Sequence, residues 1–172
     1  MKIYSDENGF TIIEVIAILI IVGILSVVAV SRISSNEYNI IAATDTLTSH
    51  LRLAQARAMN TSDTSSVVGV CFTSTTQYYL FYCAAAGANC NTVATNQSAF
   101  PGAGSIIMDI TGTGVTVTNG NGVILAFNRF GTPFTNAALT TILAGNLVLN
   151  LQDGSGRTRT INITPQTGMI TS

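Results

Sequence analysis

Residues 9–30 read GFTIIEVIAILIIVGILSVVAV, and this stretch decides the architecture expected for the chain. From Ile12 to Val30 the only polar side chains are those of Glu14 and Ser26. The 21 residues from 10 to 30 would span about 31 Å as a helix, which matches the hydrocarbon core of a bilayer. The stretch therefore predicts a transmembrane helix.

A short polar segment, MKIYSDENG (residues 1–9), precedes this stretch. A secretory signal peptide would have a shorter apolar core and a small-residue cleavage site after it, and no such site closes the apolar stretch. On hydropathy alone, an ordinary single-pass anchor is the favoured interpretation.

The residues that follow, 31–60, have an amphipathic pattern. Apolar and small side chains recur at three- and four-residue spacing, which indicates a helix with one buried face. These residues are Ile40, Ile41, Thr44, Leu47, Leu51, Ala54 and Ala58. The first proline is Pro101, so no proline breaks a helix between residues 10 and 60. We therefore predict one long N-terminal helix, with a transmembrane first half and a second half packed on a soluble domain.

Residues 61–172 carry the pattern of a small antiparallel β-sheet domain, which makes the expected fold class α+β. Short runs rich in β-branched and aromatic residues alternate with turns. Strands are predicted at residues 67–73, 77–83, 105–110, 115–118, 123–128, 147–152, 158–164 and 169–171. The segments NGNG (119–122) and DGSG (153–156) predict hairpin turns, because glycine and asparagine accept positive φ.

The composition favours an extracytoplasmic domain with one disulfide. Only 9% of the 172 residues are charged and the formal net charge is −1, so no strongly charged partner is indicated. Three cysteines suggest one disulfide and one free thiol. Pairing of Cys83 with Cys90 is preferred because it closes a short loop, and pairing of Cys71 with Cys83 stays open as the alternative. Cys71 lies in an apolar run and is expected to be a buried small side chain.

Gly9-Phe10, followed by Glu14 and the apolar run, resembles the processing signal of type IV pilins and type II secretion pseudopilins. The resemblance implies that a prepilin peptidase cuts between Gly9 and Phe10 and that Phe10 becomes the N-methylated terminus. The family carries an acidic residue at the position of Glu14. The leader is more acidic than is usual in the family, and Ser31 stands where major pilins often have proline, which is more typical of minor subunits. The implied segments are a leader (1–9), a transmembrane and assembly helix (10–30), its amphipathic continuation (31–60) and a β-rich globular head (61–172).

Glu14 is the residue to which the resemblance gives an assembly role. A carboxylate at the centre of a membrane helix costs about 2.5–3.5 kcal/mol, and less near the edge, so it needs a partner. After cleavage, the free amine of Phe10 on a neighbouring subunit can pair with Glu14 and set the axial register of a filament. The competing interpretation is that Glu14 merely lies at the level of the lipid headgroups.

The distal half resembles the head of GspH/FimT-type minor pilins, and MSHA-type minor pilins share the layout. The resemblance lies in segments 127–133 (FNRFGTP), 153–156 (DGSG), 161–164 (INIT) and 167–170 (TGMI). Some FimT-like subunits contact DNA phosphates through a Gly-Arg-x-Arg motif, which corresponds here to Gly156, Arg157 and Arg159. Three arginines and three aspartates cancel in residues 61–172, which gives little attraction for DNA. The competing interpretation is that Arg157 or Arg159 pairs with Asp153.

No catalytic residue, cofactor or metal site is expected, because the single histidine, His50, has no ligand cluster around it in the sequence. The predicted function is a minor pilin or pseudopilin of a type IV pilus or a type II secretion pseudopilus. Its expected partners are the prepilin peptidase and N-methyltransferase, other pilins and the inner-membrane assembly platform. The expected location is the inner membrane, with a periplasmic head, before assembly and the filament afterwards. The alternatives are a DNA-uptake subunit, an adhesive tip subunit and an anchored β domain without a filament role.

Overall fold

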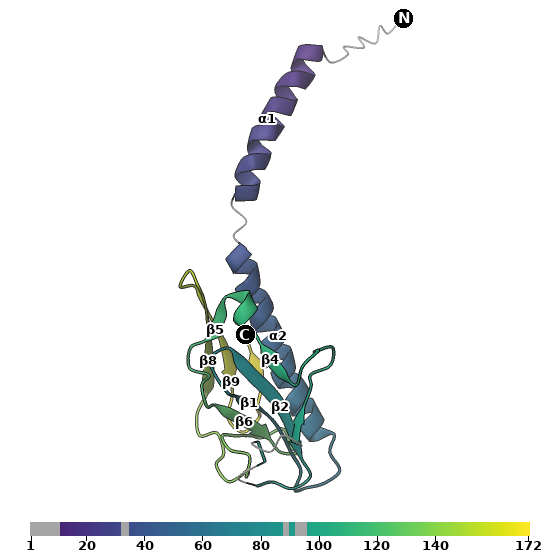
Figure 1. The fold of residues 1–172 in the computed structure, drawn as a ribbon, viewed down its shortest axis with the longest axis vertical. Coiled ribbons are helices and arrows are strands. Elements are labelled where there is room, and N and C mark those ends of the chain that lie inside the picture. The colour runs from purple at the N-terminus through teal and green to yellow at the C-terminus, as the bar shows by residue number, and fades with distance from the viewer. Residues whose placement is uncertain (1–10, 32–34, 88–89, 92–95) are drawn as a thin grey trace, which may run out of the picture. The chain divides into compact units, whose positions relative to one another are not determined.

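A computed structural model describes residues 11–31, 35–87, 90–91 and 96–172 (Figure 1). The chain forms two compact units, Met1–Ser35 and Asn36–Ser172. The first unit contains helix α1 (Ile12–Ser31). The second unit is mostly β, with helix α2 (Ser35–Met59) and two antiparallel sheets.

The single long helix predicted for residues 10–60 is wrong, because this part of the chain forms two helices. α1 ends at Ser31 and α2 begins at Ser35. The sequence at the junction, residues 31–36, is SRISSN. Serine hydroxyls hydrogen-bond the local backbone and favour helix ends over helix interiors, and α1 ends and α2 begins at a serine.

The membrane predictions are also wrong. Among the residues that the structure describes, no helix has both the length and the apolar character needed to cross a membrane. This finding overturns the transmembrane first half of the predicted fold class and the single-pass inner-membrane location derived from it.

α2 buries one face, as its amphipathic pattern predicts. The buried side chains of α2 are Ile40, Ala43, Thr44, Leu47, Thr48, Leu51, Ala54 and Ala58. The hydroxyl of Thr44 donates a hydrogen bond to the carbonyl of Ile40 at 2.6 Å, which satisfies a polar group on this face. The apolar members of this face share one core cluster with apolar residues of both sheets.

The first sheet has the strand order β3-β2-β1-β6-β7, and β4 also pairs with β2. All six residues of β1 are buried, because core clusters lie on both faces of this sheet. A Cβ atom at Gly69, in the middle of β1, would lie only 2.6 Å from the carbonyl oxygen of Leu125, so glycine is required there. The strands are β1 (Val67–Phe72), β2 (Gln77–Cys83), β3 (Gln97–Ser98), β4 (Ile107–Asp109), β6 (Ile124–Phe127) and β7 (Pro133–Phe134).

The second sheet has the strand order β10-β9-β8-β5. Its strands are β5 (Val115–Val117), β8 (Leu147–Asp153), β9 (Thr158–Ile163) and β10 (Ile170–Thr171), and the short 3-10 helix η2 (Thr111–Thr113) precedes β5. The predicted turn at residues 153–156 joins β8 to β9 as a hairpin. The turn at residues 119–122 is not a hairpin, because β5 pairs with β8 in this sheet while β6 belongs to the other sheet. The turn still requires glycine, because Gly122 has a positive φ of +74°.

The disulfide joins Cys83 and Cys90, with their Cα atoms 6.0 Å apart, and Cys71 is a buried free thiol. All three residues belong to the second core cluster, which also contains Phe81 and Phe134. The disulfide therefore fastens the chain after β2 onto the face of the first sheet that α2 does not cover.

Candidate functional site

α1 presents large apolar side chains around its whole circumference. Twelve of them are exposed by between 46% and 81% of their surface, from Ile12 to Val27. A helix that is apolar on all sides is normally buried, and an exposed apolar surface of this extent marks an interaction site. α1 is therefore the first candidate functional surface.

The start of α1 is capped by Thr11. The Glu14 N–H lies 3.1 Å from the Thr11 carbonyl and 3.4 Å from the Thr11 hydroxyl, which accept hydrogen bonds from it. Thr11 and Glu14 have the spacing of a capping box, and a carboxylate in the first turn is stabilised by the helix dipole. The proposed processing residues, Gly9 and Phe10, lie outside the described residues.

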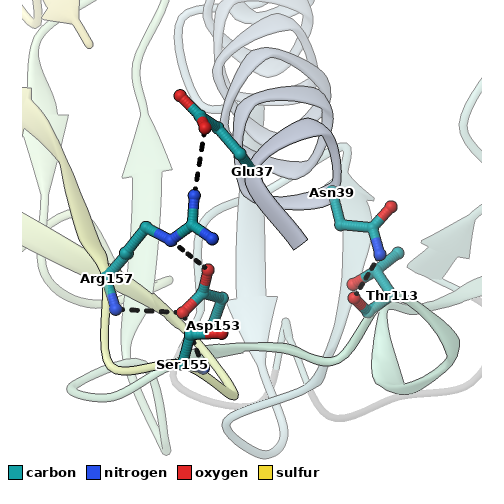
Figure 2. A network of polar contacts seen from close by, with 6 residues as sticks. All are labelled: Glu37, Asn39, Thr113, Asp153, Ser155 and Arg157. Carbon is teal, nitrogen blue, oxygen red and sulfur yellow. Dashed lines mark hydrogen bonds and ion pairs between the residues drawn. The ribbon is translucent and has the colours of Figure 1, made fainter. Parts of the chain in front are cut away.

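A second candidate site is a polar network at the first turn of α2, shown in Figure 2. Arg157, which precedes β9, lies between two carboxylates. Its Nη1 atom is 3.1 Å from Oε2 of Glu37, and its Nε atom is 3.5 Å from Oδ2 of Asp153. The network therefore ties the beginning of α2 to the β8–β9 hairpin, across 120 positions of sequence.

Asp153 is the structural centre of this hairpin. Its side chain is only 2% exposed, whereas the side chain of Glu37 is 62% exposed. Oδ1 of Asp153 accepts hydrogen bonds from the backbone N–H groups of Ser155 and Arg157, each at 2.9 Å. Asp153 thus orders the turn and holds the guanidinium that reaches Glu37.

A separate contact holds the same turn of α2 from another side. The side-chain amide of Asn39 donates a hydrogen bond to the carbonyl of Thr113 in η2 at 3.0 Å (Figure 2). Further along α2, Nη2 of Arg52 donates to the carbonyl of Ile170 in β10 at 2.9 Å. Polar contacts from several side chains of α2, which also include two hydrogen bonds from Gln55, therefore supplement the buried apolar face in fixing this helix on the sheets.

The two arginines of the possible DNA motif are in different situations. Arg157 is engaged by Glu37 and Asp153, the second of which was the competing interpretation of the sequence. Arg159 lies in the exposed first half of β9. A DNA phosphate would have to compete with two carboxylates for Arg157, and DNA contact stays a prediction.

His50 lies at the boundary of the core, on α2. Its Nδ1 atom is 3.0 Å from the hydroxyl of Tyr78, and its ring stacks on Phe100 with the centroids 3.8 Å apart. Burial lowers the pKa of His50 from its usual 6.5 and raises the pKa of Tyr78. Tyr78 therefore stays protonated near neutral pH, and neutral His50 can accept its hydrogen.

The described part of the chain contains no group of three or more His, Cys, Asp or Glu residues that could hold a metal ion. The expectation that the chain is not an enzyme and needs no cofactor remains a prediction from the sequence.

Comparison with known proteins gives no relative. No protein-family model, curated protein or solved structure matches this chain.

Sequence reasoning missed two features of these sites. The cap at Thr11 has a sequence signal, Thr-x-x-Glu before an apolar run, which is the pattern of a capping box. The ion pair between Arg157 and Glu37 has no such signal, because the two residues are 120 positions apart in the sequence and only the tertiary fold brings them together.

Asp153→Asn should lower the free energy of unfolding by about 2 kcal/mol, because it turns an amide donor toward the Arg157 guanidinium inside a buried turn. Glu37→Gln should cost at most about 0.5 kcal/mol, since that carboxylate is exposed and screened. Urea unfolding of the full chain, followed by circular dichroism, measures both. A cost for Glu37→Gln equal to that of Asp153→Asn would contradict this assignment.

Acidification from about pH 7.5 to about pH 5 should destabilise the head through His50. The pKa of His50 is lower in the folded chain than in the unfolded chain, so on acidification the unfolded chain takes up the proton first. The free energy of unfolding is therefore highest above pH 6.5 and decreases as the pH falls through the folded pKa. In His50→Gln this pH dependence should flatten, while the stability of the variant at high pH stays comparable. The pKa values of Asp63 and Asp109 are also lowered, from 3.8, so these groups titrate below this window. An unchanged slope in His50→Gln would contradict the assignment.

Proposed function

We propose that this chain is a minor subunit of a filament of the type IV pilin class, a type IV pilus or a type II secretion pseudopilus. In this proposal the chain is processed between Gly9 and Phe10 and assembles through α1. The observation that carries the proposal is that α1 is a separate unit, apolar on all sides, with one carboxylate in its first turn.

The apolar surface of α1 supplies the driving force for assembly. Fully burying one large aliphatic side chain stabilises by about 1.5–3 kcal/mol. α1 exposes twelve such side chains, and only neighbouring helices packed around it would bury them on every side. A bundle of α1 helices from successive subunits meets this requirement.

Glu14 supplies specificity within such a bundle. Covering α1 with other apolar helices would bury its carboxylate, and a buried charge without a partner is strongly destabilising. Cleavage after Gly9 would create a free amine on Phe10, four residues before Glu14. Pairing of this amine with Glu14 of a neighbouring subunit would neutralise both charges and fix the axial step. The partners implied are the prepilin peptidase with its N-methyltransferase activity, other pilins or pseudopilins, and an assembly platform.

The DNA-uptake alternative has weaker support. Of the two arginines that would contact phosphates, Arg157 already has two carboxylates within 4 Å, Glu37 and Asp153. Such a pair of negative groups offsets the positive charge that would attract a phosphate.

Intact-mass spectrometry of the chain, expressed with a prepilin peptidase, tests the processing. We expect a product that begins at Phe10 and carries one methyl group on its N-terminal amine. Gly9→Val should block cleavage, because a branched side chain is placed next to the scissile bond, whereas Gly23→Val, within α1, should leave it intact. A mature chain that still begins with Met1, or one cut at another bond, would refute the pilin assignment.

Glu14→Gln should reduce the amount of chain recovered in sedimented filaments by at least about tenfold, because the buried amine of Phe10 would lose its counter-charge. The substitution keeps the backbone N–H that is bonded to Thr11, so the start of α1 is preserved. Glu37→Gln removes the same charge from the first turn of α2 and serves as the matched control.

Thr11→Val tests the helix cap independently of the charge of Glu14. It removes the hydroxyl acceptor and should weaken the start of α1 by about 1 kcal/mol, without abolishing assembly.

Normal assembly of Glu14→Gln would refute the pairing role and leave the processing claim standing.

A further inference from the structure

An open pocket of about 520 Å³ lies where the end of α2 meets the first sheet. Small-molecule sites typically enclose about 300–1,000 Å³, so this pocket has room for a ligand of that size. Its lining comes from the last turn of α2, from β1 and β2, and from the edge strand β3 with the residue before it. None of these residues takes part in the α1 surface or in the Arg157 network.

The pocket exists because α2 ends at Met59 while β2 continues beside it to Cys83. Val68 of β1 pairs with Tyr82 of β2, so their side chains lie on the same face of the sheet. Leu80 lies two positions before Tyr82 in β2, so its side chain is on that face too. Val68 and Leu80 are buried beside α2 and form an apolar floor. Tyr82 is 46% exposed and provides an aromatic wall.

The rest of the lining is rich in neutral hydrogen-bonding groups. Thr61 and Ser98 contribute hydroxyls, and Asn96 contributes a side-chain amide whose NH2 group also donates to the carbonyl of Cys90. Gln97 pairs with Phe81, so its side chain lies on the other face of the sheet. The hydroxyl of Thr61 donates its hydrogen to the carbonyl of Ala58, so the groups that remain for a ligand are mainly acceptors, the oxygens of the Asn96 amide and of the two hydroxyls. Such a set of acceptors beside an apolar floor suits a ligand that carries several hydroxyl groups and one apolar face.

Among the described residues that line the pocket, Arg57 is the one that carries a charge. It lies half-buried in the last turn of α2, and within the described ranges no carboxylate is within ion-pair distance of it. A guanidinium at the wall of a pocket is suited to a planar carboxylate, which it binds through two parallel hydrogen bonds. The ligand that satisfies the whole lining therefore has an acidic group as well as hydroxyls.

We propose that this pocket binds an acidic saccharide, with one uronate unit at Arg57, its apolar ring face on Tyr82 and its hydroxyls on the Asn96 amide and the hydroxyls of Thr61 and Ser98. The assignment gives the head a ligand-binding activity of its own. It does not depend on the filament role, because it uses only residues of the second compact unit.

Titration of the full chain with digalacturonic acid, followed by ligand-observed NMR, tests the proposal. We expect saturable binding in the millimolar range or tighter. The dimethyl ester of the same disaccharide keeps its shape and loses its charge, so it should bind about tenfold more weakly. Arg57→Gln should weaken binding of the acid about tenfold and change binding of the ester by less than about twofold.

Two further variants locate the site. Tyr82→Ala, at a half-exposed position, should weaken binding of both the acid and the ester about fivefold. Arg129→Gln removes a positive charge elsewhere on the head, where the guanidinium lies 4.7 Å from the ring of Phe130, and should leave binding unchanged. Unaltered thermal unfolding of each variant would show that the fold is retained.

Three results would overturn the proposal. The first is the absence of saturable binding of digalacturonic acid to the unaltered chain. The second is binding that Arg57→Gln and Arg129→Gln affect equally, which would place the ligand elsewhere. The third is tighter binding of a short glutamate-containing peptide than of the saccharide, which would assign the pocket to acidic peptides.

Discussion

The head is organised by a packing constraint on α2, whose buried face has to contact apolar residues of two sheets at once. Leu47 and Leu51 are almost fully buried, and the same core cluster contains Val70 of β1 and Leu149 of β8. Alanines on this face, such as Ala54, allow the helix to approach the strands closely. Interiors packed at this density tolerate little change in volume, so the two sheets hold their positions largely through this helix.

The two ends of α2 have different surroundings, and the candidate sites of the head follow from this difference. The beginning of the helix makes polar contacts with Arg157 and with the carbonyl of Thr113. The last turn ends short of the sheet edge and leaves Tyr82 exposed beside Arg57. One end of the helix is therefore an anchor for distant loops, and the other end is the wall of a pocket.

Local physical chemistry predicted much of the fold. The period-3.6 stripe of α2, the β-branched runs of β1 and β9 and the glycine turn at residues 153–156 are signals carried by a few adjacent residues. The separation of α1 from α2 was not predicted, because residues 10–60 contain no proline to signal it.

Long-range arrangement was harder to predict. The turn at residues 119–122 has the composition of a hairpin, but β5 finds a better partner in β8 of the other sheet. The candidate sites depend on similar long-range contacts. Arg57 and Tyr82 come together only because the last turn of α2 lies against β2, and Glu37 meets Arg157 only after the second sheet has formed. No local pattern in the sequence contains this information.

The order of the strands in the second sheet has a consequence for how the chain folds during its synthesis. α2 leaves the ribosome early, whereas β8, β9 and β10, which contribute Leu149, Ile161 and Ile170 to the same cluster, are made last. Strands of the first sheet are made earlier and can cover part of the apolar face of α2, but the part that contacts the second sheet stays exposed until synthesis is nearly complete. Contacts of such long sequence separation make folding slow and expose the nascent chain to aggregation.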